Sequence, residues 1–157
     1  MLPMRTILVP TDFSCSSANA FAIAASLARE GGARVILLHV LSEPTFMEGT
    51  GLIPFEPAMY RDEMHDKLEQ QASHYPGLWL EERLVEGKPI PEILRTAHEN
   101  QCDLIVMGTH GENGLRRLLM GSVAEGVARK AACPVLSVRT SVPKQGAVPV
   151  LAETASD

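Results

Sequence analysis

The sequence predicts an α/β protein: a doubly wound, five-stranded parallel sheet with helices on both faces. Runs of strand-like and helical periodicity alternate along the chain, which is typical of consecutive βαβ units. The runs at 34–41 and 103–107 have almost no polar alternation, as expected for strands covered on both faces. With 157 residues, 45% of them hydrophobic, the chain can bury a core without disulfides or a structural metal. We expect a single domain over residues 1–140.

The first strand and the first helix are separated by a turn of polar residues. Residues 6–9 form an apolar run, which ends at a turn signal, Pro-Thr-Asp, at residues 10–12. Apolar residues then recur at helical spacing. The hydroxyl of Ser14 or Ser16 can cap the start of this helix, and the two glycines at 31–32 can end it, because positive φ is accessible to glycine.

The next strand, at residues 34–41, is expected in the middle of the sheet. It contains His39, which we interpret as a hydrogen-bonded core histidine rather than a catalyst, because the run around it is apolar. Residues 42–57 are rich in proline and glycine and predict a long loop. A second helix is then predicted from the spacing of Met64, Leu68, Ala72 and Tyr75.

The third strand, at residues 78–86, has the charges of an edge strand. Two glutamates and an arginine interrupt it at 81–83, and such charges keep an exposed edge from pairing with other chains. A third helix is predicted from Pro89, because the first turn of a helix tolerates a missing N–H. The fourth strand is the apolar run at 103–107.

A last helix and a fifth strand complete the pattern. Ser122 and Glu125 have the spacing of a capping box, which predicts a helix with Ser122 as its N-cap. Basic residues in the last turn of this helix complement its dipole, and Pro134 stops it before a strand at 135–138. Residues 141–157 show no periodicity and predict a flexible tail.

Composition excludes several classes of partner. The formal net charge is −5, and no basic run is longer than the pair Arg116 and Arg117, which argues against a nucleic acid or an anionic membrane. No segment approaches the roughly 18 apolar residues of a membrane helix, and no signal peptide is evident. Cys15, Cys102 and Cys133 are widely spaced and odd in number, which favours reduced thiols with packing roles. We therefore expect a cytoplasmic protein.

The connection after the fourth strand is a candidate ligand site. It carries glycines at 108, 111, 114 and 121 and exceeds the roughly two to six residues usual between a strand and a helix. Glycine lets backbone amides approach an anion, and the following helix adds free N–H groups and a positive dipole end. Phosphate is the natural ligand of such a loop. By spacing alone, glycines that only shape a surface loop are an equal alternative.

Asp12 adds a carboxylate at the end of the first strand. If the strand order is 3-2-1-4-5, the first and fourth strands are neighbours whose connections leave toward opposite faces, and such sheets bind ligands at that point. Asp12 can then accept a ribose hydroxyl or hold a magnesium ion, with a role in the turn alone as the alternative. The sequence contains no P-loop, and no GxGxxG follows the first strand.

Several of these motifs together resemble the universal stress protein family. They are PTDFS at 10–14, LHV at 38–40, GTHG at 108–111, GSVA at 121–124 and CPVLSVR at 133–139. The likeness extends from residue 4 to residue 139. The spacing of the glycines resembles the motif of the ATP-binding branch of the family, a combination far more specific than any single glycine.

The resemblance implies a site for ATP with Mg²⁺. Pro10 and Val40 are implied to enclose the adenine, and Asp12 to flank the ribose. The glycines and the start of the last helix are implied to line the phosphates. The full set implied to contact the nucleotide is Pro10, Thr11, Asp12, Val40, Met107, Gly108, His110, Gly111, Gly121, Ser122 and Val123.

The resemblance also implies a two-fold homodimer. Its fifth strands would meet along an uncharged apolar edge, formed by Val135, Leu136, Ser137 and Val138, which needs a cover.

Our first hypothesis is a cytoplasmic ATP-binding stress protein that uses nucleotide occupancy as a signal, with at most slow hydrolysis, because no catalytic base stands out. The alternative is a nucleotide-free stress adaptor or chaperone-like interaction module, which resembles the other branch of the family. An ATP-consuming hydrolase of a related fold would need a glycine-serine turn after the first strand, which PTDFS does not provide.

Overall fold

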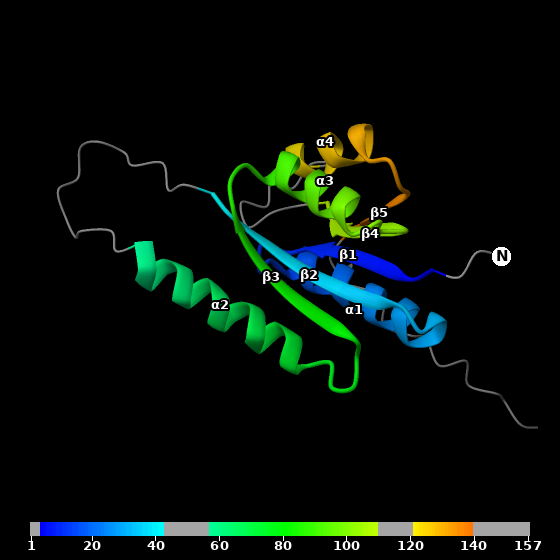
Figure 1. Ribbon diagram of the computed structural model, residues 1–157, viewed down its shortest axis with the longest axis horizontal. Coiled ribbons are helices and arrows are strands. Elements are labelled where there is room, and N and C mark those ends of the chain that lie inside the picture. The colour runs from blue at the N-terminus through cyan, green and yellow to red at the C-terminus, as the bar shows by residue number, and fades with distance from the viewer. Residues whose placement is uncertain (1–3, 43–56, 110–120, 140–157) are drawn as a thin grey trace, which may run out of the picture.

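The computed structural model describes residues 4–42, 57–109 and 121–139 (Figure 1). These residues form one five-stranded parallel sheet in the order β3-β2-β1-β4-β5, which confirms the predicted fold class and strand order. Residues 43–56 of the predicted loop and the predicted tail at 141–157 lie outside the described residues. The strands are β1 (Thr6–Pro10), β2 (Arg34–Leu41), β3 (Leu80–Glu86), β4 (Leu104–Gly108) and β5 (Val135–Val138).

The described helices cover both faces of the sheet, so alternate residues of one strand enter two separate cores. Ile7 and Val9 of β1 pack with Phe21 in the core under the first two helices. Leu8, between them, packs with Ile93 in the core under the last two. The helices are α1 (Cys15–Gly31), α2 (Pro57–Ser73), α3 (Pro89–Glu99) and α4 (Ser122–Lys130).

The first helix begins and ends as the sequence predicts. Ser14 is the N-cap of α1, and its side chain accepts a hydrogen bond from the backbone N–H of Ser17. Gly32 follows the helix with φ of 67°, a left-handed conformation that glycine adopts without strain. The turn between β1 and α1, which contains Asp12, is therefore fixed at its helical end.

Some residues at the ends of elements lie outside the elements predicted to contain them. Leu78 and Trp79 precede β3, which begins at Leu80. α2 ends at Ser73, so Tyr75 lies in the turn that follows, where its ring centroid is 4.3 Å from that of Phe21. Tyr75 still packs against the core, although it does so without being helical. Helical spacing predicted its burial, and the turn at Gly77, with φ of 77°, changes the chain direction before β3.

Asp103 precedes β4 instead of starting it. Its Oδ2 accepts the backbone N–H groups of Thr6, at 2.9 Å, and Arg5, at 2.8 Å. These two bonds stabilise the charged form and hold the pKa of Asp103 below its ordinary value. The carboxylate thus joins the start of β1 to the start of β4, the two strands whose opposite ends border the site described below.

All three cysteines are free thiols, but they do not share one environment. Cys102 is buried, and burial raises its pKa to about 11, so the thiol is protonated at neutral pH. Cys133 is half-buried and packs in the same core as Cys102. Cys15 is exposed, so the predicted packing role is wrong for this residue. Within the described part of the chain, no helix has the length and apolar character needed to cross a membrane.

Candidate functional site

A cavity of ≈ 410 Å³ opens where β1 and β4 end side by side. β1 continues into α1 on one face of the sheet and β4 leads to α4 on the other, so the cavity lies at the predicted switch point. Its volume is in the range of small-molecule sites, about 300–1,000 Å³. The predicted residues that line it are Pro10, Thr11, Asp12, Val40, Met107, Gly108, Gly121, Ser122 and Val123.

His110 and Gly111, which were also predicted for this site, lie outside the described residues. The remaining lining residues were not predicted as site residues. Tyr60 comes from α2, and Pro89 and Ile93 come from the first turns of α3, elements that the motifs do not include. The others are Ser17, Leu38, His39, Ser42, Thr109 and Ala124.

The turn after β1 is held by a network of buried hydroxyls. Thr11 is only 5% exposed, and its Oγ1 lies 3.1 Å from both the Ser17 Oγ and the Gln71 Oε1. The same oxygen accepts the backbone N–H of Phe13 at 3.1 Å, and the Thr11 N–H donates to the Leu38 carbonyl at 2.8 Å. These hydrogen bonds of the Thr11 hydroxyl and of its backbone N–H fix the conformation of the turn.

Asp12 is exposed at the cavity and also takes part in this turn. Its Oδ1 accepts the backbone N–H of Ser14 at 3.0 Å, which is the turn role that the sequence allowed. A carboxylate has about four acceptor positions on its two oxygens, so this single bond leaves capacity for a ligand. The turn role and a ligand role are therefore compatible.

His39 does not lie in the core as predicted. It is half-buried, lines the cavity, and its Nδ1 is 2.7 Å from the carbonyl oxygen of Thr11. The prediction was wrong because His39 and Val40 border the cavity and are half-buried, whereas the other apolar residues of β2, including its last residue Leu41, are buried. The expectation that this histidine is hydrogen-bonded is confirmed.

The N-cap of α4 lies one residue earlier than the sequence predicts. Gly121, with φ of −55° and ψ of 150°, is the N-cap and Ser122 is the first helical residue, so the predicted capping box is wrong. Glu125 pairs instead with Arg129, through Oε1 and Nη2 at 2.6 Å. Gly121 has no side chain with which to cap the first N–H groups of the helix, and Ser122 and Val123 of this first turn line the cavity.

The cavity therefore combines the start of a helix with an apolar wall. The backbone N–H groups of Ser122 and Val123 belong to the first turn of α4, where the helix dipole favours negative charge. The wall, in contrast, suits a flat apolar ring. It is made of Pro10, Leu38, Val40, Ile93 and Met107.

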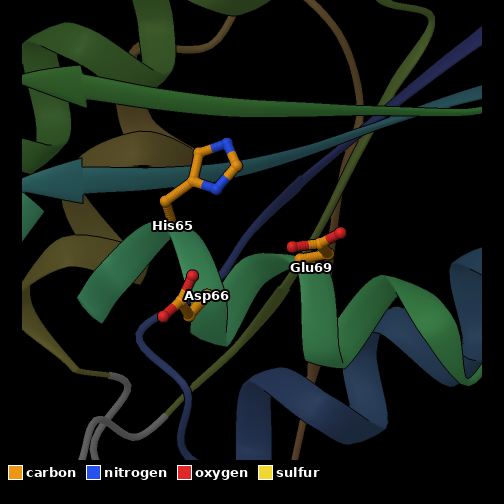
Figure 2. A group of neighbouring side chains, drawn as sticks. All are labelled: His65, Asp66 and Glu69. Carbon is orange, nitrogen blue, oxygen red and sulfur yellow. The ribbon is translucent and has the colours of Figure 1, made fainter. Parts of the chain in front are cut away.

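A second group of polar side chains lies on α2, outside the cavity lining (Figure 2). His65, Asp66 and Glu69 each offer one ligand atom, and these atoms lie within 4.8 Å of one another. All three side chains are exposed on the same helix, as is common on a solvated helix surface. This group was not predicted from the sequence, although the i, i+4 spacing of His65 and Glu69 is a signal that places two such side chains on one helix face.

A doubly wound parallel sheet with a cavity and a helix N-terminus at its switch point is typical of the α/β proteins that bind ligands at the carboxyl edge of the sheet. Within this class, the chain belongs to the universal stress protein family, whose model matches residues 3–139. Universal stress protein MJ0531 of Methanocaldococcus jannaschii is 36% identical over 142 residues, which are 86% of this chain and 82% of that protein.

Solved structures of the family have the same fold. A universal stress protein in complex with cAMP aligns with a TM-score of 0.68 and 27% identity, over 89% of this chain and 100% of that one. The universal stress protein from Archaeoglobus fulgidus in complex with dAMP aligns with a TM-score of 0.62 and 27% identity, over 88% and 99% of the two chains. Structural neighbours of this chain therefore bind adenine nucleotides.

Proposed function

We propose that this protein binds ATP with Mg²⁺ in the cavity at the switch point, and that it acts in the cytoplasm as a nucleotide-responsive homodimer. One observation carries the proposal. The cavity brings the Asp12 turn, an apolar wall and the first turn of α4 together in a space of ≈ 410 Å³. A nucleotide needs three such surfaces, one for the sugar hydroxyls, one for the base and one for the phosphates.

The polar surfaces of the cavity match the sugar and the phosphates. The N–H groups of Ser122 and Val123, together with the Ser122 hydroxyl, would bind phosphate oxygens. The Asp12 carboxylate would accept a ribose hydroxyl, with the backbone of Thr11 beside it. In this proposal His110 and Gly111, from the connection after β4, complete the phosphate side.

The base would lie against the apolar wall, between Pro10 and Val40, with Met107 and Gly108 beside the ribose. Burial of one face of a purine supplies affinity without specifying the base by hydrogen bonds. The complexes of family members with cAMP and dAMP support an adenine nucleotide as the ligand.

Mg²⁺ would enter with the nucleotide. Asp12 is the only carboxylate among the described residues that line the cavity. Mg²⁺ in nucleotide sites keeps several waters and binds through one or two carboxylates and the phosphates, so a single carboxylate is enough to hold it.

We propose little or slow hydrolysis, and hence a role for nucleotide occupancy as a signal. Rapid hydrolysis requires a group that positions or deprotonates the attacking water. Among the described lining residues, Asp12 is engaged with the Ser14 N–H and the His39 Nδ1 with the Thr11 carbonyl. Both candidate groups therefore already have structural roles in the turn.

The first experiment is equilibrium binding of MgATP to the purified protein by titration calorimetry. We expect saturable binding below about 1 mM, a range typical of nucleotide sites. Asp12→Asn keeps the oxygen that accepts the Ser14 N–H but removes the charge, and it should weaken binding about tenfold. Absence of MgATP binding to the wild type at millimolar concentration would contradict the proposal.

The homodimer would form along β5. This strand is at the edge of the sheet and pairs only with β4 among the described strands. Leu136 is 40% exposed on it, and the strand carries no charge to discourage pairing with another chain. A second copy of the chain, related by a two-fold axis, would satisfy the open edge and bury Leu136.

Leu136→Lys is expected to convert the protein to a monomer, because a charge on an edge strand opposes strand pairing. Sedimentation velocity at micromolar concentration measures the change. Glu82→Lys places the same side chain on β3, at the opposite edge of the sheet, and should leave the dimer intact. A wild type that sediments as a monomer would contradict this interface.

A further inference from the structure

The turn between β1 and α1 contains a strained residue. Phe13 has φ of 64°, in the left-handed region that bulky residues with a Cβ rarely adopt. It lies directly after Asp12, so the backbone that carries the carboxylate into the cavity depends on this conformation. A strained residue of this kind persists only where its surroundings hold it in place.

His39 holds this turn from the side of the sheet. Because a carbonyl oxygen can only accept, the His39 ring donates from Nδ1 to the Thr11 carbonyl, at 2.7 Å. The same ring lies against Phe13, with centroids 4.5 Å apart and planes tilted by 38°. One side chain thus contacts the residues on both sides of Asp12.

Residues of α2 also contact the turn. Gln71 accepts the Thr11 hydroxyl at 3.1 Å, and the Lys67 Nζ lies 5.9 Å from the centroid of the Phe13 ring. These contacts restrain the Thr11 side chain and the outer face of Phe13. Among the hydrogen bonds of the described residues, only that of His39 reaches the carbonyl of Thr11, which belongs to the peptide that leads into Asp12.

The His39 side chain is not required to build the sheet. β2 is paired with β1 on one side and with β3 on the other through backbone bonds, and His39 lies opposite Leu84 in that ladder. Its ring is half-buried and lines the cavity. The position of His39 therefore indicates a role in the site more than a role in the stability of the fold.

We propose that His39 is a positioning residue of the nucleotide site, which keeps the Thr11–Phe13 turn in the conformation that presents Asp12 to the sugar. This inference rests on the proposed nucleotide function. Without the His39 bond, the turn would relax in part to less strained conformations in the free protein. Only a fraction of the free molecules would then hold the conformation that presents Asp12. The apparent affinity would fall in proportion to that fraction.

The experiment compares two ligands and two substitutions by titration calorimetry. The ligands are MgATP and Mg-2′,3′-dideoxyATP, which lacks both sugar hydroxyls that Asp12 could bind. His39→Leu removes the donor but keeps most of the side-chain volume. His39→Asn keeps an N–H donor near the position of Nδ1. Val35→Ala, in the buried start of β2 at the other end of the strand, controls for loss of stability alone.

We expect the wild type to bind ATP several-fold more tightly than the dideoxy nucleotide. His39→Leu should weaken ATP binding about fivefold to tenfold, the worth of one hydrogen bond, and should leave dideoxyATP binding nearly unchanged. The preference for ATP would therefore disappear. His39→Asn should restore most of the preference for ATP over dideoxyATP. Val35→Ala should keep this preference in full despite a lower melting temperature.

Two results would overturn the inference while the proposed function stands: a wild type that binds both nucleotides equally, or a His39→Leu variant with the wild-type preference. Weakening of both ligands by the same factor in His39→Leu would also overturn it, because that result indicates a role outside the sugar contact. A wild type that binds neither nucleotide would remove the proposed function itself.

Discussion

Gly108→Ala is expected to lower the free energy of unfolding by about 2–3 kcal/mol, which is large for the addition of one methyl group. A Cβ at this position would lie 2.7 Å from the backbone carbonyl carbon of Ser16 and closer still to the hydroxyl oxygen of that residue. Ser16 is buried in the first turn of α1, so β4 and α1 would have to separate. Thermal unfolding should show a fall in Tm of roughly 4–12 °C for a chain of this size.

A matched control for this substitution lies at the other end of α1. Gly31→Ala adds the same methyl group to the last residue of the helix, where no atom lies within 4 Å, so it should be neutral or stabilise the protein by up to about 1 kcal/mol. Ser16→Ala should not rescue Gly108→Ala, because the backbone carbon of residue 16 remains in the way. A Gly108→Ala variant as stable as the wild type would contradict the close contact between α1 and β4.

Gly108 also shows how a sequence can predict a residue for only part of its role. The sequence selected it as one of several glycines that let a backbone approach phosphate. The structure gives it a packing role as well, since it ends β4 directly beneath the first turn of α1 and lines the cavity. Only the position of α1 in space shows this second role, and no local pattern contains that information.

The fold was largely predictable because each element has a strong local signal. The run at 34–41 is apolar except for Arg34 and His39, and β2 has the same bounds, Arg34–Leu41. The charges at 81–83 predicted an edge, and β3 is at an edge. Errors arose where tertiary structure determines the environment. Tyr75 is half-buried and packs against the core from a turn instead of a helix, and Cys15 is exposed although cysteine is usually buried.

The candidate site was predictable to the extent that it is built from strand ends and glycines. Pro10, Asp12 and Gly121 were selected from motifs, and all three line the cavity. Tyr60 and Ile93 also line the cavity but were not selected from the sequence. They reach the cavity through the packing of α2 and α3, and their local sequence is that of an ordinary helix. His39 was assigned to the core, because a sequence run does not show which residues of a strand border a cavity.

Gly121→Asp is expected to abolish MgATP binding, by about a hundredfold or more, while it leaves the fold intact or more stable. Gly121 is the N-cap of α4, with φ of −55° and ψ of 150°, which any residue can adopt. Aspartate is among the best N-cap residues, so the helix should gain stability. The new carboxylate, however, would occupy the place proposed for the phosphates and repel them, by up to about 4 kcal/mol per unit charge at 4 Å in a partly screened site.

Gly121→Asn separates this charge effect from the effect of size, because asparagine has nearly the same shape and is an equally good N-cap. Calorimetry with MgATP should rank the wild type first, Gly121→Asn second and Gly121→Asp far below both, while circular dichroism and Tm show that both variants are folded. High salt should narrow the gap between the two variants, since screening weakens repulsion but not a steric conflict. Equal MgATP affinities for Asp and Asn at this position would mean that the phosphates do not approach the start of α4, and the proposed orientation of the nucleotide would then be wrong.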